Sequence, residues 1–385
     1  MTNLRPEHEI LVCVARRALD ECTAARLRVL LQKEVEWDFL LNSAFAHGVL
    51  PLLAAHLNTC GCDLVPLQIL ERLRSSLLIN RQNSLYLLRQ LLDLLQLFTV
   101  NGIHVLTFKG PVLAETLYGD LGLRQAGDID ILIVREDFQR ARDLLQTNSY
   151  LMEPQLTSAQ QASHLRCQCE IQFFHEDQFS VVDLHWGLTP KSFPFGLGPE
   201  ELFARSEKIS LAGHTIETFD RVDLLLYLCV HGAKHYWRRL EWVASIAGLV
   251  RSTPGLDWSL AIRRSRQTRS GRILVLGLLL AGNVFDLELP REIEELLSGG
   301  KGLRECALGL EEELLQGTPV SATQGERFRL NLQFMDRKRD AIQGLLREVL
   351  VPTISDWQAL TLPTPLYPLY YLLRPLRLLR KHSAS

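Results

Sequence analysis

Two aspartates stand one residue apart in the segment "RQAGDIDILIV", which runs from Arg124 to Val134. In a strand, alternate side chains point to the same face, so Asp128 and Asp130 would project together while the apolar residues around them face the other way. Two carboxylates at this spacing repel each other unless a cation lies between them. Mg²⁺ takes oxygen ligands and usually binds through one or two carboxylates together with phosphates. The pair therefore predicts a site for Mg²⁺ or Mn²⁺, and the simpler alternative is a solvated strand end.

A third carboxylate is available in the segment "SVVDLHW", where Asp183 stands in a second alternating strand. If this strand pairs beside the first, three carboxylates could hold two metal ions about 3.5–4 Å apart, an arrangement that clamps the attacking and leaving oxygens in phosphoryl or nucleotidyl transfer. His185 shares a face with Asp183. We expect it to support the metal ligands, or else to be a packed or capping histidine.

The segment "FKG", Phe108 to Gly110, ends a predicted strand and opens a helix. A helix N-terminus directs backbone N–H groups and the helix dipole at an anion, Lys109 adds a positive charge, and Gly110 permits close approach. Arg124 is a second cation suited to a triphosphate or a leaving pyrophosphate. The sequence thus predicts a phosphate site next to the carboxylates.

The segment "HGAKH" places His231 and His235 one helical turn apart on one face, which is a spacing found in zinc sites. The metalloprotease motif requires a glutamate directly after the first histidine, but Gly232 stands there. We favour an electrostatic role, in which His231, Lys234 and His235 face phosphates or an acidic acceptor across a cleft. A surface or capping role is the alternative.

The elements that must position these residues follow from periodicity. Leucines at intervals of three and four residues predict helices up to Asn101. Strands are predicted at 103–108, 128–134, 169–175 and 180–188, with helices at 111–119 and 135–150 between them. Beyond Pro199 the pattern is helical again, with Asp220 as an N-cap. We expect an α+β fold in three regions: an N-terminal helical region (1–101), a core (102–219) and a C-terminal helical domain (220–385).

Composition and charge exclude several classes of protein. Hydrophobic residues make up 47% of the 385 residues and the formal net charge is −2, so neither nucleic-acid binding through a global basic field nor disorder is expected. The cysteines at 60 and 62 and at 167 and 169 form Cys-x-Cys pairs. Since no signal peptide opens the chain, we predict reduced thiols in a cytoplasmic protein rather than a metal site.

The apolar segments are shorter than the ~20 residues that a membrane span requires, which predicts a protein without integral membrane contact. The C-terminal segment "YYLLRPLRLLRK" combines leucines and tyrosines with basic residues around Pro375. It is typical of an interfacial membrane helix, or of a helix that docks onto the helical domain. Trp237 and Trp242 are expected in the core rather than as platforms for base stacking.

The segment "FKGPVLAETLYGDLGLRQAGDIDILIV" resembles the signature of the uncharacterised nucleotidyltransferase family of the DNA polymerase β superfamily, and "VDLHW" and "HGAKHYWRRLEWV" are similar to two further stretches of that family. The resemblance implies a small mixed β-sheet with helices on one side, flanked by helical regions, and a two-metal transfer of a nucleoside monophosphate. It also assigns roles: Asp128, Asp130 and Asp183 would be metal ligands, while Lys109, Gly110 and Arg124 would line the phosphate side.

Two departures from the family pattern concern the phosphate side and the helical domain. Related transferases carry Gly-Ser after the first strand, whereas this chain has Gly110 followed by Pro111. The proline removes a hydroxyl and a backbone N–H, so phosphate binding would depend mainly on Lys109. Relatives also often place an aspartate near the position of Ser245.

The sequence therefore predicts a Mg²⁺-dependent nucleotidyltransferase that moves a nucleoside monophosphate from an NTP such as ATP to a hydroxyl acceptor and releases pyrophosphate. Asp183 would help to activate the acceptor, and Lys109 and Arg124 would stabilise the leaving pyrophosphate. The near-neutral charge favours a protein or small-molecule acceptor over RNA. One alternative is a non-catalytic nucleotide sensor or scaffold that retains the fold, and another is kinase-like transfer of the γ-phosphate.

Overall fold

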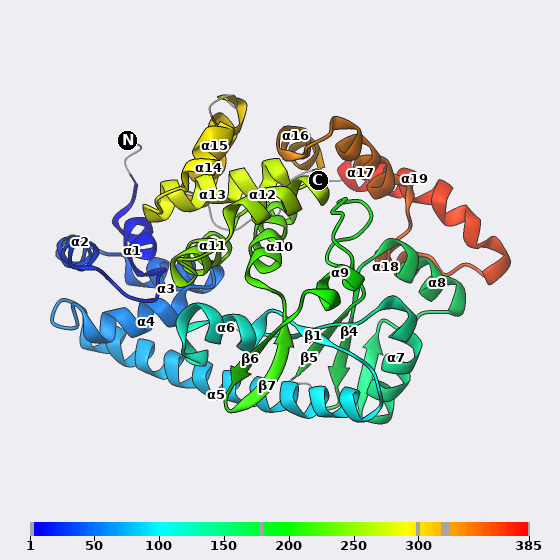
Figure 1. Cartoon of the computed structure of the whole chain (residues 1–385), viewed down its shortest axis with the longest axis horizontal. Coiled ribbons are helices and arrows are strands. Elements are labelled where there is room, and N and C mark those ends of the chain that lie inside the picture. The colour runs from blue at the N-terminus through cyan, green and yellow to red at the C-terminus, as the bar shows by residue number, and fades with distance from the viewer. Residues whose placement is uncertain (1–3, 126, 178–179, 298–300, 317–323, 384–385) are drawn as a thin grey trace.

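The computed structural model describes residues 4–125, 127–177, 180–297, 301–316 and 324–383. A small β-sheet lies between a long helix on one side and a stack of helices on the other (Figure 1). The N-terminal region consists of α1 (Pro6–Val14), α2 (Glu21–Leu31), α3 (Trp37–Ala46), α4 (Leu50–Thr59) and α5 (Leu67–Val100). These helices agree with the leucine periodicity of this part of the sequence.

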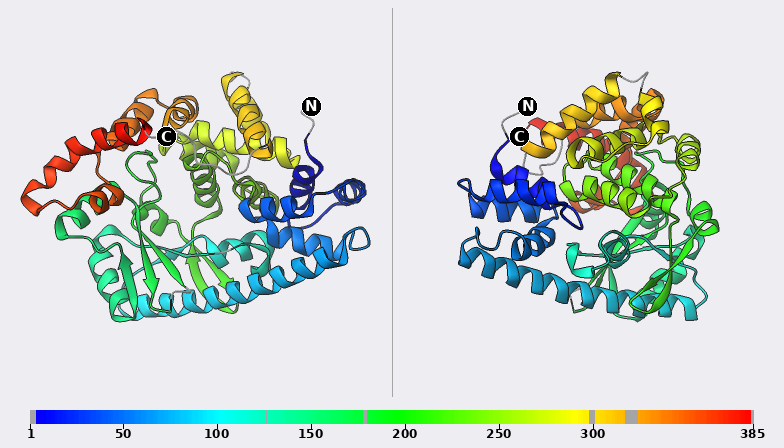
Figure 2. Two further views of the ribbon diagram at one scale, coloured as in Figure 1. Left: turned by 180° about the vertical axis from the view of Figure 1, so that it is seen from behind. Right: turned by 60° about the vertical axis from the view of Figure 1, so that its left-hand side comes forward.

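Helix α5 has 34 residues and is therefore about 50 Å long. Its first turns contribute Ile69 and Leu73 to a hydrophobic cluster that also contains the N- and C-terminal helices. Its later turns contribute Leu91 and Phe98 to a second cluster under the sheet. The two views in Figure 2 show α5 along one edge of the molecule, with the C-terminal helices at the opposite edge.

The main sheet has five strands in the order β1-β2-β5-β4-β3. Its strands are β1 (Leu106–Thr107), β2 (Ile129–Leu132), β3 (Tyr150–Glu153), β4 (Glu170–His175) and β5 (Val181–His185), connected in part by α6 (Gly110–Tyr118), α7 (Phe138–Thr147) and α8 (Ser158–Cys167). Strands β2 and β5 are parallel, whereas the other neighbouring pairs are antiparallel. The sheet is therefore mixed.

The two faces of β2 differ in what they contact. Ile129 and Ile131 belong to the cluster formed with α5 and α7. Because side chains alternate along a strand, Asp130 and Leu132 face the other way, and Leu132 joins the cluster of the C-terminal helices. The carboxylate is therefore held in the layer between the sheet and the helical domain.

A hairpin follows α9 (Pro199–Ala204) and consists of β6 (Glu207–Leu211) and β7 (His214–Thr218). The two residues of its turn, Ala212 and Gly213, both have positive φ angles, as the tight turns of two-residue hairpins require. Strand β7 contacts β1, so the hairpin extends the structure at the end of the sheet where β1 lies.

The C-terminal region is helical. It contains α10 (Arg221–Lys234), α11 (Leu240–Ser252), α12 (Trp258–Gln267), α13 (Gly271–Phe285), α14 (Arg291–Leu297), α15 (Lys301–Gln316), α16 (Gln324–Phe334), α17 (Lys338–Leu350), α18 (Ile354–Ala359) and α19 (Tyr370–Ser383). The predicted cap of α10 is present, because the Asp220 carboxylate accepts a hydrogen bond from the Asp223 backbone N–H at 2.8 Å.

The structure confirms the predicted fold class, a small mixed sheet flanked by helical regions. It adds β3, α8 and the β6–β7 hairpin, which were absent from the predicted elements. The division at residues 101 and 219 stays a prediction. Trp237 lies in the core with no exposed surface, whereas Trp242 is half-buried and its ring lies 5.0 Å from that of His235.

The C-terminal segment "YYLLRPLRLLRK", which is typical of an interfacial membrane helix or of a docked helix, lies in α19. Arg374 and Arg377 from this helix form ion pairs with Asp356 of α18, as expected of a docked helix, while Leu372 and Leu379 are exposed. Within the described residues, no helix has both the length and the apolar composition needed to cross a membrane. The eight cysteines are free thiols.

Candidate active site

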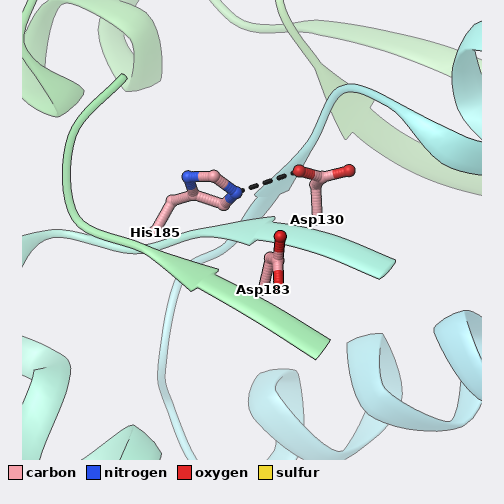
Figure 3. A group of neighbouring side chains, drawn as sticks. All are labelled: Asp130, Asp183 and His185. Atoms are coloured by element: carbon pink, nitrogen blue, oxygen red, sulfur yellow. Dashed lines mark hydrogen bonds and ion pairs between the residues drawn. The ribbon is translucent and has the colours of Figure 1, made fainter. Parts of the chain in front are cut away.

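The register between β2 and β5 places two of the predicted metal ligands side by side. Asp130 and Asp183 are directly paired across the parallel strands, and Figure 3 shows their side chains on the same face with His185. Asp130, Asp183 and His185 each offer one ligand atom, and these atoms lie within 4.8 Å of one another. The expected pairing of the two strands is therefore present.

Asp130 is the most enclosed acid of the group, with 1% of its surface exposed. Its Oδ1 accepts hydrogen bonds from Lys109 Nζ at 2.7 Å and from His185 Nε2 at 2.9 Å. Burial acts to raise the pKa of Asp130, but the charges of Lys109 and His185 outweigh it and lower the pKa to about 2. Its other oxygen, Oδ2, is buried and has no hydrogen-bond partner among the described residues.

His185 lies between two carboxylates. Its Nε2 contacts Asp130, and its Nδ1 lies 3.1 Å from Glu170 Oε2, an ion-pair contact without ideal hydrogen-bond geometry. Burial acts to lower the pKa of His185, but the charge of Glu170 and the bond to Asp130 raise it well above its ordinary value. The raised pKa favours the protonated ring. In that form His185 would hold Asp130 in place and would have no lone pair to offer a metal.

Asp183 has a different environment from Asp130. Its Oδ1 accepts a hydrogen bond from Gln172 Nε2 at 3.0 Å, and Gln172 is its direct neighbour on β4. Burial, followed by the negative charges of Asp130 and Asp128, raises the pKa of Asp183 to about 6. A carboxylate with this pKa can exchange a proton near neutral pH, and a cation at the site would favour its ionised form.

Asp128 precedes the first residue of β2 and lies outside the group of three that share the 4.8 Å spacing. Burial and the neighbouring charge of Asp130 raise its pKa, while Lys109 and Arg124 act in the opposite direction. Asp128 is therefore within electrostatic range of the other acids. The structure brings Asp130 and Asp183 into direct register on two interior strands of the sheet, with Asp128 just before β2.

Lys109 and Gly110 form the junction between β1 and α6. Gly110 has a φ of +50°, and a Cβ there would lie 3.2 Å from the Asp128 carbonyl oxygen, so glycine suits both the backbone conformation and the space. Pro111 occupies the first turn of α6, where its missing N–H costs no helical hydrogen bond. The ammonium of Lys109 is directed at Asp130. Burial acts to lower the pKa of Lys109, but the charge of Asp130 outweighs it and raises the pKa.

An acid on α11 lies near Arg124. Glu241 is 8% exposed, and burial raises its pKa while the charges of Arg124 and Arg239 act against this. Glu241 stands one helical turn before Ser245, whose hydroxyl donates to the Glu241 backbone oxygen at 2.6 Å. The aspartate expected near Ser245 is thus absent, but α11 carries a buried acid one turn earlier that can orient a basic residue.

The face formed by His231, Lys234 and His235 contacts the same site. Lys234 Nζ lies 3.7 Å from Glu170 Oε1, and the two histidine rings are 4.8 Å apart. Burial, supported by the nearby lysines, lowers the pKa of His231 well below its ordinary value and lowers that of His235 to about 4. These shifts favour the neutral forms of both histidines, which leaves Lys234 as the cation of this face.

Sequence reasoning missed Glu170, Gln172 and Glu241. The first two alternate with Ile171 and Phe173 in the segment "CEIQFFH", so period-two alternation would have placed them on the polar face of β4. Glu170 is directly paired with His185 and Gln172 with Asp183. No comparable signal marks Glu241, because its place depends on how α11 packs.

Comparison with known proteins decides the family. A family model described as uncharacterised nucleotidyltransferase matches residues 33–286. The chain belongs to this family. The match contains the five-stranded sheet, α10, α11 and every site residue described above, whereas α1, α2 and the helices after α13 lie outside it. No curated protein matched the chain. For this nucleotidyltransferase family member, a nucleotide is the class of substrate that the family implies.

The donor set fits a hard divalent cation. Carboxylate oxygens are the ligands that Mg²⁺ and Mn²⁺ prefer, and Asp130 Oδ2 is a buried acceptor without a partner among the described residues. Burial, followed by the negative charges of the neighbouring acids, raises the pKa values of Asp128 and Asp183, and a bound cation would stabilise their ionised forms. The residues present are therefore suited to bind such an ion.

The pKa of Asp183 predicts how pH affects the metal-free protein. The folded-state pKa of Asp183 is about 6, above the ordinary value of 3.8, which means that the ionised side chain destabilises the folded protein. The free energy of unfolding is therefore highest below about pH 4 and declines as the pH rises through 6. The shift corresponds to up to about 3 kcal/mol. Relative to Asp183→Asn, the metal-free wild type is expected to lose stability from about pH 4 to pH 7, as measured by urea unfolding. A pH-independent difference between the two proteins would contradict this.

Proposed function

We propose that this protein is a metal-dependent nucleotidyltransferase that transfers a nucleoside monophosphate from an NTP to a hydroxyl acceptor and releases pyrophosphate. The observation that carries the proposal is the direct pairing of Asp130 with Asp183 on parallel strands, in a chain that belongs to a nucleotidyltransferase family. Paired carboxylates on neighbouring strands can hold metal ions for nucleotidyl transfer.

The acidic residues would hold the metal and accept the proton. Asp128, Asp130 and Asp183 would bind Mg²⁺ or Mn²⁺, which when bound supplies a Lewis acid for phosphoryl oxygens. The acceptor oxygen attacks the α-phosphorus, the bond from that phosphorus to the β-phosphate bridging oxygen breaks, and pyrophosphate leaves. Asp183, whose ionised form a bound cation would favour, would help to activate the acceptor hydroxyl by accepting its proton.

The basic residues would bind the phosphates. Lys109 stands at the N-terminus of α6, where the helix dipole also favours an anion. Its ammonium is already positioned by Asp130 at 2.7 Å, and Arg124 lies within electrostatic range of Asp128. Both cations can stabilise the negative charge that develops on the leaving pyrophosphate. Gly110 would allow the backbone to approach the phosphates closely.

A second layer of charges would keep the ligands in position. Two basic and two acidic side chains alternate in a row that ends at Asp130. Lys234 lies 3.7 Å from Glu170, Glu170 lies 3.1 Å from His185, and His185 lies 2.9 Å from Asp130. Through its contact with Asp130 at 2.9 Å, His185 would fix the orientation of the Asp130 carboxylate, a role comparable to the outer-shell partners of other metal ligands.

The test is a labelling experiment. The protein, with Mg²⁺ or Mn²⁺, is incubated with each NTP labelled at the α- or at the γ-phosphate, in the presence of a cell extract as the source of acceptor. We expect α-label on an acceptor and γ-label in pyrophosphate, both dependent on the metal and abolished by a chelator. Transfer of γ-label would support a kinase-like reaction instead. Nucleotide binding by calorimetry without any transfer would favour a sensor.

A net charge of −2 gives no general attraction to a polyanion. We therefore propose a protein or small-molecule hydroxyl as the acceptor. Separating the labelled products by ribonuclease and protease treatment distinguishes these cases: a product that ribonuclease destroys would overturn this part of the proposal.

A further inference from the structure

A cavity lies away from the candidate active site. It has a volume of about 430 Å³ and is bounded by the loop after α1, the C-terminal end of α6 and the later turns of α11. In Figure 1 these elements meet between the N-terminal helices and the helical domain. Its polar lining residues are Arg16, Arg17, Asp20, Arg251 and Ser252, and its apolar surface includes Leu117, Tyr118 and Ala244.

The lining of this pocket is positively charged. It contains three arginines and one aspartate, which leaves two positive charges in excess. Asp20 is partly engaged elsewhere, because it caps α2 by accepting a hydrogen bond from the Thr23 backbone N–H at 2.7 Å. Arg17 has no ion pair or side-chain hydrogen bond within the described part of the chain, and its guanidinium lies next to Gly119 at the end of α6.

Arg16 is buried in this pocket without full hydrogen bonding. Its side chain is 10% exposed, and its Nη1 donates to Thr23 Oγ1 at 3.2 Å and lies 3.8 Å from Asp20 Oδ2. Its Nε is buried and has no partner among the described residues. A buried donor on a charged group is costly unless it meets an acceptor, so the arrangement favours an anion in the cavity.

Arg251 approaches the same space from α11. One of its guanidinium nitrogens donates to the Phe285 carbonyl oxygen. Burial, followed by repulsion from Arg16, lowers the pKa of Arg251, although Asp20 and Asp286 act against this. Two partly buried cations, Arg16 from the loop after α1 and Arg251 from α11, therefore repel each other, and a bound anion would relieve this repulsion.

We propose that this pocket binds a small organic anion, with a phosphate or carboxylate held by Arg16, Arg17 and Arg251 and an apolar body against Leu117 and Tyr118. The cavity volume is in the range of small-molecule sites, and arginine forks match both anionic groups. The site is separate from the candidate active site, because it contacts the C-terminal end of α6 whereas Lys109 precedes its N-terminus.

Binding of phenyl phosphate and of benzoate, measured separately by titration calorimetry on the full-length protein, tests the proposal. We expect at least one of them to bind, with inorganic phosphate binding more weakly because it lacks the apolar body. The exposed residue Arg17 permits the variant Arg17→Glu, which is expected to weaken binding at least about tenfold through like-charge repulsion. Arg251→Gln is a second variant, and its thermal unfolding is measured to confirm that it is folded.

Two control variants locate the binding. Arg89→Glu changes an arginine on α5 that is 82% exposed and lies outside this pocket, so binding should be unchanged. Lys109→Met removes one of the cations of the candidate active site and should also leave binding to this pocket intact. The proposal is overturned if neither phenyl phosphate nor benzoate binds the wild type at millimolar concentration, if Arg17→Glu binds as the wild type does, or if binding is lost in Lys109→Met instead.

Discussion

Asp130→Asn is expected to reduce nucleotidyl transfer by about 10³-fold or more. The amide keeps the size of the side chain but removes the charge on the one acid that is paired with Asp183 and contacts both Lys109 and His185. Metal binding should be weakened in parallel, because a neutral amide is a poorer ligand than a carboxylate. Labelling with α-labelled NTP, together with calorimetric titration of Mn²⁺, measures both effects.

This variant also carries a stability cost that must be separated from the loss of activity. The amide leaves the buried charges of Lys109 and His185 without their common partner, and breaking a buried pair in this way costs roughly 3–5 kcal/mol. Asp183→Asn, which removes a carboxylate that contacts Gln172 but not Lys109, should lose activity without this penalty. Asp143→Asn, at a position that is 58% exposed, is the control. Transfer at the wild-type rate in a folded Asp130→Asn protein would refute the assignment.

Lys109→Met is expected to lower transfer by about 10²-fold and to raise the KM for the NTP. The change removes the only ammonium that contacts Asp130 among the described residues and leaves an apolar stem of similar length. Since Lys109 helps to lower the pKa of Asp130 to about 2, that pKa should rise. In the wild type, ionised Asp130 stabilises the fold above its ordinary pKa, and this stabilisation is lost as the pH falls toward 2. The variant should therefore have less of this stabilisation. Kinetics and acid unfolding measure the two consequences.

The chain offers a matched lysine for comparison. Lys234→Met removes a cation that contacts Glu170 at 3.7 Å and does not contact Asp130, so it should change activity far less. Equal losses in the two lysine variants would mean that general positive potential, rather than the position of Lys109, supports the reaction. A wild-type KM in Lys109→Met would remove Lys109 from the proposed phosphate site.

The acids of the site could be predicted from sequence because their signals are local. Alternation in "DIDILIV" and "SVVDLHW" determines which side chains share a face, and the paired register of Asp130 and Asp183 agrees with it. The pairing of Lys109 with Asp130 and the charged state of His185 were not predictable in this way. They depend on the direction in which α6 follows β1 and on Glu170 of the neighbouring strand β4, which is paired with His185. These are tertiary contacts, and no periodic pattern in the sequence marks them.

The missing elements of the fold have similar explanations. Strand β3 has only four residues. One of its two exposed side chains, Leu151, is apolar, so its pattern is too short and too irregular to distinguish from a loop. The β6–β7 turn uses Ala212 before Gly213 with positive φ at both, whereas asparagine or aspartate is the usual first residue of such turns. Without that residue, the hairpin lacks its strongest local signal.

The long helix α5 has a consequence for how the molecule unfolds. Its N-terminal turns are buried with the helical regions and its C-terminal turns with the sheet. If either core unfolds and releases its part of α5, the other core loses part of the continuous helix that it packs against. Helix formation is cooperative along the chain, which couples the melting of one core to that of the other. We therefore expect the helical regions and the sheet to unfold as one cooperative unit, and a fragment cut at residue 101 would separate the sheet from the helix that packs against it.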